Sequence, residues 1–442
     1  MGIEIGQWFR AYKRNAPGWQ QRIGRKNVLR AAVLSLILRL FQPHKVVAED
    51  RVEYRFEDYK EEDNRIHIRT HAVGFEKELT SQITTHGLLI YDGISGATPT
   101  GEAPATGSNV LPSVHMHDIR RAATLDFSIH YGQHTTTPSF TYSEESDYIS
   151  RGISLTHAID FNQKNTTLVL GAAHNFDSVA GGPLTSFQQK DSTDVLIGLN
   201  QILTPTTIFS ANLSLGYSDG YLGDPYRSVS FVLPDSPDPI FSDPSQTIPK
   251  FESRPHHRFK QVGFFSITQA IKPLDASIEG DYRLYHDDWG IIANTISLTW
   301  YQKITKYVTV SPNVRYYRQT AADFYAPYFT GLSFDEYANG TQVAFQDGAF
   351  YAFADDPAFP AAGAPGFTFL NVPARPNYYS SDYRLSELEA WTFGVGAQIR
   401  IADHFTIDAA YKYYKMRGLD HVTPQAAYPT ANVVTIGAGI WF

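Results

Sequence analysis

Apolar and polar side chains alternate with a period of two residues in segment after segment of this chain. Residues 391–401, WTFGVGAQIRI, show the pattern clearly, because every odd-numbered position is apolar and every even-numbered one is polar or glycine. Successive side chains of a β-strand point to opposite faces of its sheet. The alternation therefore predicts strands with one apolar face and one polar face.

Sixteen such strands are expected after residue 50, an even number that suits a closed antiparallel barrel. They are predicted at residues 51–60, 65–78, 80–92, 118–131, 135–143, 149–160, 166–174, 193–203, 206–217, 257–270, 274–285, 290–303, 307–318, 384–401, 404–416 and 431–442. The apolar parity of the second strand shifts near Ala72 and Val73, which predicts a β-bulge or a misplaced boundary there.

The connections between these strands alternate in length. Every second one is a tight turn, such as Thr80-Ser81, Thr204-Pro205 or Lys272-Pro273. The intervening ones include the long segments 93–117, 175–192, 218–256, 319–383 and 417–430. All long loops would then lie at one end, as in outer-membrane barrels with short periplasmic turns and long external loops. A β-sandwich has no reason to segregate its loops in this way.

The strand count also decides which face points outward. A barrel of sixteen strands encloses a lumen too wide for side chains to fill. An apolar interior would leave a large dry void, so the apolar faces should meet lipid and the polar faces should line a wet lumen. Strand closure would satisfy every backbone hydrogen-bonding group, as the hydrocarbon requires.

Composition excludes several classes of protein. The chain of 442 residues has no cysteine, which excludes disulfides, thiolate metal sites and cysteine nucleophiles. Mean hydropathy is below zero, and no run of 18 uncharged apolar residues occurs, which argues against a helical membrane protein. An aromatic content of 14% suits strands and interfacial girdles.

Residues 1–48 have a different composition from the rest. They carry nine Lys/Arg and one acidic residue, and then the apolar run AAVLSLILRLF at 31–41. This pattern predicts a secretory signal peptide cleaved near Ala48, although Arg39 interrupts the apolar run and a short amphipathic helix is the alternative. Residues 49–442 would then form one barrel domain with a formal charge of −16, which disfavours nucleic-acid partners.

The chain ends in NVVTIGAGIWF, residues 432–442, a strand with a continuous apolar face and a face of small or polar residues. We expect it to close the barrel against the first strand, with its apolar face toward outer-membrane lipid. Its last residues, Ile440, Trp441 and Phe442, resemble the signal that the barrel-assembly machinery recognises in outer-membrane proteins, and the resemblance implies that they serve assembly.

Three internal stretches are similar to a known family. They are YDGISGATPTG at 91–101, YSEESDYISRGISL at 142–155 and DFNQKNTTLVLG at 160–171. Together they resemble an uncharacterised bacterial family, a domain of unknown function expected to form outer-membrane barrels. The resemblance spans the chain from about residue 49 and supports a Gram-negative setting, but implies no substrate and no catalytic residues.

Charged side chains on the polar strand faces are the best candidates for function. They are Asp275, Glu279, Asp281, Arg283, Arg315, Arg400, Asp408 and Lys412. Acidic and basic rows facing each other across a pore would create a transverse field that filters polar solutes. Alternatively, these charges pair with one another and fill the lumen.

The segment Glu144 to Tyr148 places three carboxylates at an expected hairpin tip, and Glu61, Glu62 and Asp63 form a second acidic group. Clustered carboxylates with flanking hydroxyls could hold Ca²⁺, which prefers oxygen ligands. No EF-hand spacing is present, and such tips are more often simply solvated, so the sequence predicts no metal site and no cofactor.

Histidines with neighbouring carboxylates occur at several expected loop ends. They are His115, His117 and Asp118, then His256 and His257, and then His286, Asp287 and Asp288. Imidazole and carboxylate together could bind a transition metal or form a hydrolytic pair. No local signature of an outer-membrane hydrolase accompanies them, so no catalytic residue is predicted.

Three functions follow from these patterns. The leading one is a porin-like channel or substrate-selective transporter for an unknown polar solute, possible also as a homo-oligomer. A partner-binding scaffold with a closed lumen is the second, and an outer-membrane hydrolase is the third. The aromatic loop 319–383 is long enough to fold into the lumen or to cap it, because its Phe and Tyr side chains must pack on something.

Overall fold

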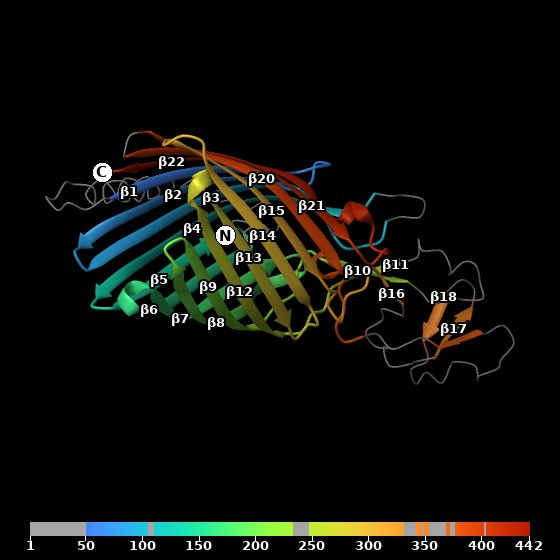
Figure 1. Cartoon of the computed structure of the whole chain (residues 1–442). Helices are drawn as coiled ribbons and strands as arrows, with labels where there is room; N and C mark the ends of the chain where they lie inside the picture. Colours follow the sequence, from blue (N-terminus) through green and yellow to red (C-terminus); the bar gives the residue numbers. More distant parts are fainter. Residues whose placement is uncertain are drawn as a thin grey trace, which may run out of the picture.

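Sixteen antiparallel strands close on themselves in a barrel, in which each strand pairs with its neighbour along the chain (Figure 1). The structure is a computed structural model and describes residues 50–104, 110–232, 247–330, 342–346, 349–352, 368–371, 376–401 and 404–442. The predicted signal segment 1–48 lies outside these residues. The expected all-β class, the up-and-down order and the number of barrel strands are confirmed.

The barrel strands follow the predicted segments closely. They are β1 (Arg51–Glu61), β2 (His67–Thr80), β3 (Ile83–Pro99), β4 (Ser113–Tyr131), β5 (His134–Glu144), β6 (Tyr148–Phe161), β7 (Thr166–Gly181), β8 (Leu184–Thr204), β9 (Thr207–Gly220), β12 (His257–Ile271), β13 (Ala276–Asp287), β14 (Ile292–Lys303), β15 (Val308–Gln319), β20 (Leu388–Ile401), β21 (Phe405–Gly418) and β22 (Thr430–Trp441).

Short segments occupy the connections. The described helices are single 3₁₀ turns, η3 (Asn162–Lys164), η4 (Lys272–Leu274), η6 (Tyr383–Leu385) and η7 (Gln425–Ala427). Two small sheets lie beyond the barrel, one of β10 (Ser228–Val232), β11 (Thr247–Phe251) and β16 (Phe329–Thr330), the other of β17 (Gln342–Gln346), β18 (Ala349–Ala352) and β19 (Thr368–Asn371). Among the described residues, no helix has the length and apolarity needed to cross a membrane.

The two ends of the barrel differ as expected, with one correction. The turns at the end that carries the C-terminus are short, and both small sheets lie toward the opposite end (Figure 1). The predicted long loop 175–192 is wrong, because β7 and β8 continue to Gly181 and Leu184. Gly181 and Gly182 both have positive φ, 99° and 54°, a conformation that lets two residues reverse the chain.

The parity shift in β2 has a cause other than the predicted bulge. Pairing of β2 with β1 and β3 continues through Ala72 and Val73, and the register of β2 with β3 shifts only between Glu78 and Thr80. The pattern changes because Ile68, on the opposite parity to the exposed Val73, is buried with Ile94 and Met116. An apolar cluster on the inner face therefore gives the same sequence pattern as a change of register would.

Large apolar side chains cover the outside of the barrel. Leu213, Phe393 and Ile436 are 49%, 52% and 50% exposed, and each lies mid-strand. Their alternate neighbours include Thr392, which is 3% exposed on the inner face. A belt of exposed apolar residues around a closed sheet is stable in hydrocarbon and unstable in water. The chain is thus a transmembrane antiparallel β-barrel.

The first and last strands meet at a fully paired seam. Pairs run from Arg51 opposite Trp441 to Glu61 opposite Ala431. The Arg55 guanidinium of β1 lies 3.7 Å from Asp408 Oδ2 of β21, across the intervening strand β22. This approach needs Gly437, because a Cβ there would lie 2.5 Å from Asp408 Oδ1. The small inner face of the terminal segment therefore makes room for a charge pair that bridges the seam.

Two adjacent residues of β9 test which face meets lipid. We predict that Leu213→Arg lowers the free energy of unfolding in lipid vesicles by about 2–4 kcal/mol, the usual cost of Arg on the lipid face at the bilayer midplane. The matched variant Ser214→Arg places the same charge on the luminal face and should cost much less. Denaturant titration of both proteins measures the difference, and equal losses would contradict the assignment of faces.

Candidate solute site in the lumen

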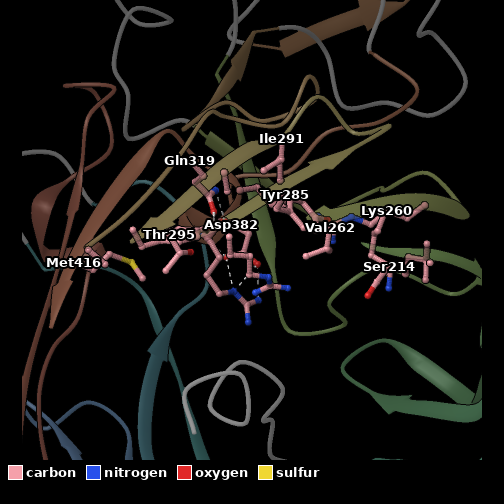
Figure 2. A pocket seen from close by; sticks show the side chains of 18 of the residues that line it. Ser214, Lys260, Val262, Tyr285, Ile291, Thr295, Gln319, Asp382 and Met416 are labelled. Atoms are coloured by element: carbon pink, nitrogen blue, oxygen red, sulfur yellow. Dashed lines mark hydrogen bonds and ion pairs between the residues drawn. The ribbon is translucent and has the colours of Figure 1, made fainter. Parts of the chain in front are cut away.

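A cavity of about 670 Å³ lies inside the barrel, toward the end with the long loops. Its wall is formed by inner-face residues of eight strands, among them Ser214, Lys260, Tyr285 and Thr295. Loop residues complete it, including Asp382, whose carboxylate lies beside guanidinium groups in Figure 2. The cavity is therefore bounded by the barrel wall and by loop segments that fold inward.

Two of the predicted pore-lining charges, Arg283 and Arg315, line this cavity. Five others share the inner parity of cavity-lining neighbours on their own strands but lie outside the cavity wall: Glu279 and Asp281 on β13, Arg400 on β20, and Asp408 and Lys412 on β21. Asp275 is not on a strand. It is exposed in the turn before β13, with a left-handed φ of 47°, so it lies at the rim.

The predicted opposition of acidic and basic rows across the pore is not found. The eight residues belong to β13, β15, β20, β21 and the turn before β13, and β13 and β21 are four steps apart in a ring of sixteen strands. They therefore share one part of the wall. Asp281 and Arg315 are paired with the same residue of β14, Ser297, from either side. Acid and base thus alternate along the wall, about 10 Å apart.

Six charged residues, three of them buried and three partly buried, form a network where the long loops enter the lumen. We call the set Asp224, Arg227, Glu252, Arg254, Asp382 and Arg384 the mouth network. Asp382 is its centre, because its Oδ2 lies 2.8 Å from Arg254 Nη2 and 2.5 Å from Arg384 Nη2. Arg384 also reaches Asp224 at 2.7 Å. Segments far apart in sequence are joined by these contacts.

The charges of the mouth network stabilise one another. Burial alone would raise the pKa of Asp382, but Arg384, Arg227 and Arg254 outweigh it and hold the pKa of Asp382 well below its usual range. Burial would likewise lower the pKa of Arg384, and Asp382 raises it instead. For Arg227 burial dominates and lowers the pKa. Removing one carboxylate would leave buried cations without compensation.

Apolar contacts attach the same loops to the barrel wall. Tyr383 is buried with Ala390 of β20, Met416 of β21 and Tyr428 of the last loop. The Tyr428 hydroxyl lies 2.7 Å from Ser386 Oγ. The sequence predicted that 384–401 is one strand, but β20 begins only at Leu388, and residues 382–386 turn inward over the cavity.

The aromatic side chains of the long loop pack as predicted where the structure describes them. Phe324 meets Trp289 edge to face at 5.2 Å, and Phe329 lies 5.8 Å from Phe231. Tyr328 differs, with 48% of its surface exposed. The side chains of Phe345 and Phe350 lie outside the described part of the chain.

The cavity wall carries an excess of positive charge. Arg258 pairs with the buried Asp287 at 2.5 Å, and the mouth network contains three acids and three arginines. Besides these residues, the described part of the wall carries Lys260, Arg283, Arg315 and Asp194, so its formal charge is +2. Basic groups in a walled cleft concentrate anions.

The predicted His/Asp sets at loop ends do not assemble. His115 and His117 share one face of β4, as predicted, and are exposed, whereas Asp118 is buried on the other face. His286 is likewise exposed beside the buried Asp287, whose carboxylate accepts from Arg258 and from the Tyr285 hydroxyl. No imidazole of these sets therefore contacts the carboxylate beside it in the sequence.

The sequence indicated Glu145 and Asp147 as candidate Ca²⁺ ligands but did not show that Asp118 lies beside them in a buried cluster. Asp118 on β4 lies with Glu145 and Asp147 of the β5–β6 turn, and one oxygen of each lies within 4.8 Å of the others. Such tips are expected to be solvated, but of the three carboxylates of this hairpin only Glu144 is exposed, and Glu145 and Asp147 are buried. Burial, followed by the charges of Asp147 and Asp118, raises the pKa of Glu145 to about 9, although Arg120 opposes the shift. Glu61, from the second acidic group, pairs with Arg65 at 2.9 Å.

Among solved structures, the chain is similar to the siderophore receptor PirA from Pseudomonas aeruginosa, with 10% identity and a TM-score of 0.39 over 90% of this chain and 63% of that one. A bacterial polysaccharide outer membrane secretin gives 8% identity and a TM-score of 0.45 over 90% of this chain and 100% of that one. For OmpT of Vibrio cholerae the values are 9% and 0.39, over 90% and 100%.

The sequence has no match among curated proteins. One family model matches it over residues 28–187 and 182–427, and it is described as "Protein of unknown function (DUF3570)". The two matches together span most of the chain, in agreement with the resemblance inferred from the motifs at 91–101 and 142–171. The chain belongs to this family of proteins of unknown function.

Proposed function

We propose that the protein is an outer-membrane channel for small polar solutes and that its lumen favours anions. The observation that carries the proposal is the 670 Å³ cavity, whose wall combines hydroxyl and amide groups with an excess of basic side chains. Lys260, Arg283 and Arg315 come from three different strands, so their charges converge on the same space. Such a site binds and orients a passing anion without any bond chemistry.

Gly216 supports a polar pathway on the wall of β9. A Cβ at this position would lie 2.3 Å from Asp194 Oδ1 and 3.1 Å from Lys260 Cε. The missing side chain lets a carboxylate of β8 and an ammonium stem of β12 approach from either side. The cavity wall is thus shaped to hold opposite charges close together, which suits zwitterionic or hydrated anionic solutes.

The mouth network favours a second function, a barrel whose lumen is closed at the long-loop end. Its residues Asp382 and Arg384 line the cavity and are held by several ion pairs each. A permanently closed mouth would suit a scaffold that binds partners through its long loops. A channel requires that this network opens or leaves a passage beside it.

Export to the outer membrane belongs to the same proposal. The signal segment 1–48 would deliver the chain to the periplasm, and the residues Ile440, Trp441 and Phe442 would be read by the barrel-assembly machinery. Ile440 and Phe442 are 46% and 53% exposed, which leaves them accessible at the rim.

The terminal signal can be tested in cells. Deletion of Phe442 should lower the amount of folded, heat-modifiable protein in the outer membrane, because assembly rather than stability is affected. The same deletion should leave refolding of purified protein in detergent unchanged. A loss in both settings would assign Phe442 a structural role instead.

Anion preference predicts a change of selectivity for Arg315→Gln. A unit charge about 7 Å from a passing ion contributes about 0.6 kcal/mol in water and acts with opposite sign on anions and cations, so its removal should lower the anion-to-cation permeability ratio about sevenfold at low salt. The reversal potential across a planar bilayer in a salt gradient measures this ratio. Arg318→Gln is the matched control, because Arg318 belongs to the same strand but has the opposite parity and pairs with Glu387. No conductance in the native protein, or equal effects of both variants, would contradict the channel.

The mouth network predicts a gain of conductance for Asp382→Asn. The variant leaves buried arginines uncompensated, which typically costs about 3–5 kcal/mol and should release the loops from the lumen. Single-channel conductance should rise, and limited proteolysis should become faster within residues 376–387. Asp288→Asn changes an exposed carboxylate at a neighbouring hairpin and should have neither effect. If Asp382→Asn loosens the loops and the barrel still does not conduct, the scaffold is favoured.

A further inference from the structure

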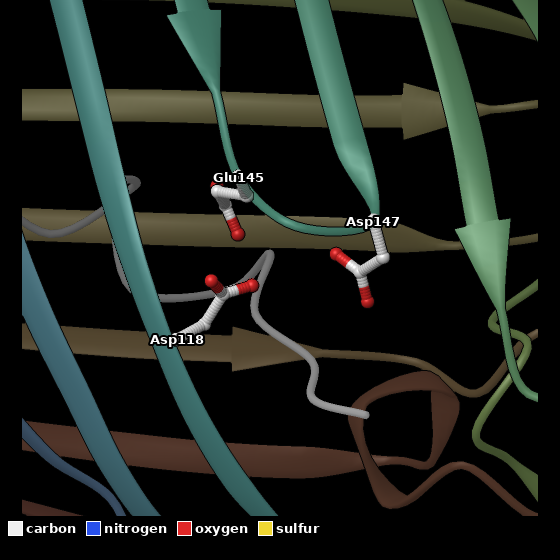
Figure 3. Close-up of side chains that lie close together, drawn as sticks. All are labelled: Asp118, Glu145 and Asp147. Carbon is white, nitrogen blue, oxygen red and sulfur yellow. The ribbon is translucent and has the colours of Figure 1, made fainter. Parts of the chain in front are cut away.

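Asp118, Glu145 and Asp147, the carboxylate cluster, lie at the long-loop end of the barrel, where β4, β5 and β6 meet their connections. Asp118 projects from β4, and the other two project from the turn that joins β5 to β6. Their carboxylates point into one space (Figure 3). Residues 27 and 29 positions apart are thus brought together by the pairing of neighbouring strands.

All three side chains are removed from solvent. Asp118, Glu145 and Asp147 are 8%, 7% and 8% exposed. Asp118 accepts a hydrogen bond from the Ser146 hydroxyl at 2.6 Å, and Asp147 accepts one from the Tyr226 hydroxyl at 2.6 Å. Glu145 differs, because its buried Oε2 has no hydrogen-bond donor. A buried carboxylate oxygen without a donor lacks the compensation that such groups normally have.

Two basic side chains on neighbouring strands have carboxylate partners outside the cluster. Arg120 donates to Asp92 at 2.5 Å, and Lys190 lies 3.1 Å from Asp177. The three carboxylates, with oxygens within 4.8 Å of one another, concentrate negative charge in a buried site. Like charges at this distance cannot all stay ionised unless a cation lies between them.

We propose that Asp118, Glu145 and Asp147 bind a Ca²⁺ ion. The three side chains offer only oxygen ligands, which Ca²⁺ prefers, whereas Zn²⁺ and Cu²⁺ favour nitrogen or sulfur ligands. The two nearby imidazoles, His115 and His117, lie on the opposite face of β4 and cannot join it. Three monodentate or bidentate carboxylates supply part of the six to eight ligands of Ca²⁺, and water supplies the rest. A cavity of about 30 Å³ beside Asp147 and Tyr226 has room for one such water.

The ion would connect the barrel wall to the mouth network. Tyr226, which donates to Asp147, is two residues from Asp224 and adjacent to Arg227, both members of that network. The Asp224 carboxylate in turn accepts from the Tyr226 backbone N–H at 3.0 Å. Bound Ca²⁺ would therefore fix the segment 224–227 against β5 and β6, on the side of the mouth opposite to β20.

The proposal is tested on the full chain refolded in detergent without lipopolysaccharide, so that lipid phosphates cannot bind the metal. Calorimetric titration of the chelator-treated protein with CaCl₂ should show one site, and MgCl₂ should bind more weakly. Glu145→Gln and Asp147→Asn should each weaken Ca²⁺ binding by at least the roughly 10- to 100-fold that loss of an outer-shell partner costs. Glu144→Gln, one residue away and exposed, is the matched control and should bind as the native protein does.

Thermal unfolding separates a metal site from a protonated carboxyl group. With chelator present, Glu145→Gln should unfold at the same temperature as the native barrel or higher, because it removes charge repulsion. With Ca²⁺ present, the native barrel should gain stability and Glu145→Gln should not. Absence of Ca²⁺ binding to the native protein, or equal weakening by Glu144→Gln, would overturn the proposal and leave Glu145 as a buried protonated acid. Heat-modifiable migration confirms that each variant is folded.

Discussion

Every backbone N–H and C=O group that crosses the hydrocarbon must find its hydrogen-bond partner within the protein. In this chain the last open edges are those of β1 and β22, and their pairing over eleven positions removes both. The even number of strands, the alternation of faces and the wide lumen all follow from that closure. The outer face then contacts lipid, so charged and hydrogen-bonding side chains can only be accommodated inside.

Charges that are confined to the lumen must be paired or hydrated. Near the middle of the wall they alternate on neighbouring strands, as with Asp281 and Arg315, and water can reach them. At the mouth they are buried, and the structure compensates them with an extended network centred on Asp382. The carboxylate cluster differs, since it brings three buried carboxylates together and leaves Glu145 Oε2 without a hydrogen-bond donor. A metal ion there would give the cluster the same compensation that arginines give the mouth network.

The alternating pattern predicted the fold because the two faces of a strand are formed by consecutive residues, so a short stretch of sequence is enough to recognise them. All sixteen strands were predicted, and the largest errors in their bounds, seven to nine residues, occurred where pairing continued beyond the apolar belt, as in β3, β7 and β8. The parity change near Ala72 was misinterpreted because an inner apolar cluster and a bulge give the same sequence pattern. The mouth network could not be predicted, because its members are up to 160 residues apart. In the carboxylate cluster, Asp118 is 27 and 29 positions from the other two members, and only strand pairing brings them together. One signal in the sequence could have indicated the cluster. Asp118 lies on the strand next to the hairpin of Glu145 and Asp147, and its side chain points to the opposite face of that strand from His117.

Glycines on the inner face determine where luminal charges can meet. Gly216 lies between Asp194 and Lys260 and lets them approach each other, and Gly437 does the same for Arg55 and Asp408. At either position a Cβ would occupy the space that the carboxylate uses, although the strand itself would tolerate a side chain. Glycine weakens a strand by loss of entropy and of packing, so its presence there is better explained by the charges it admits. The alternating pattern that identifies the strands therefore also indicates where charges meet in the lumen. Small residues on the polar face of a strand lie at the points where charged groups from neighbouring strands come together.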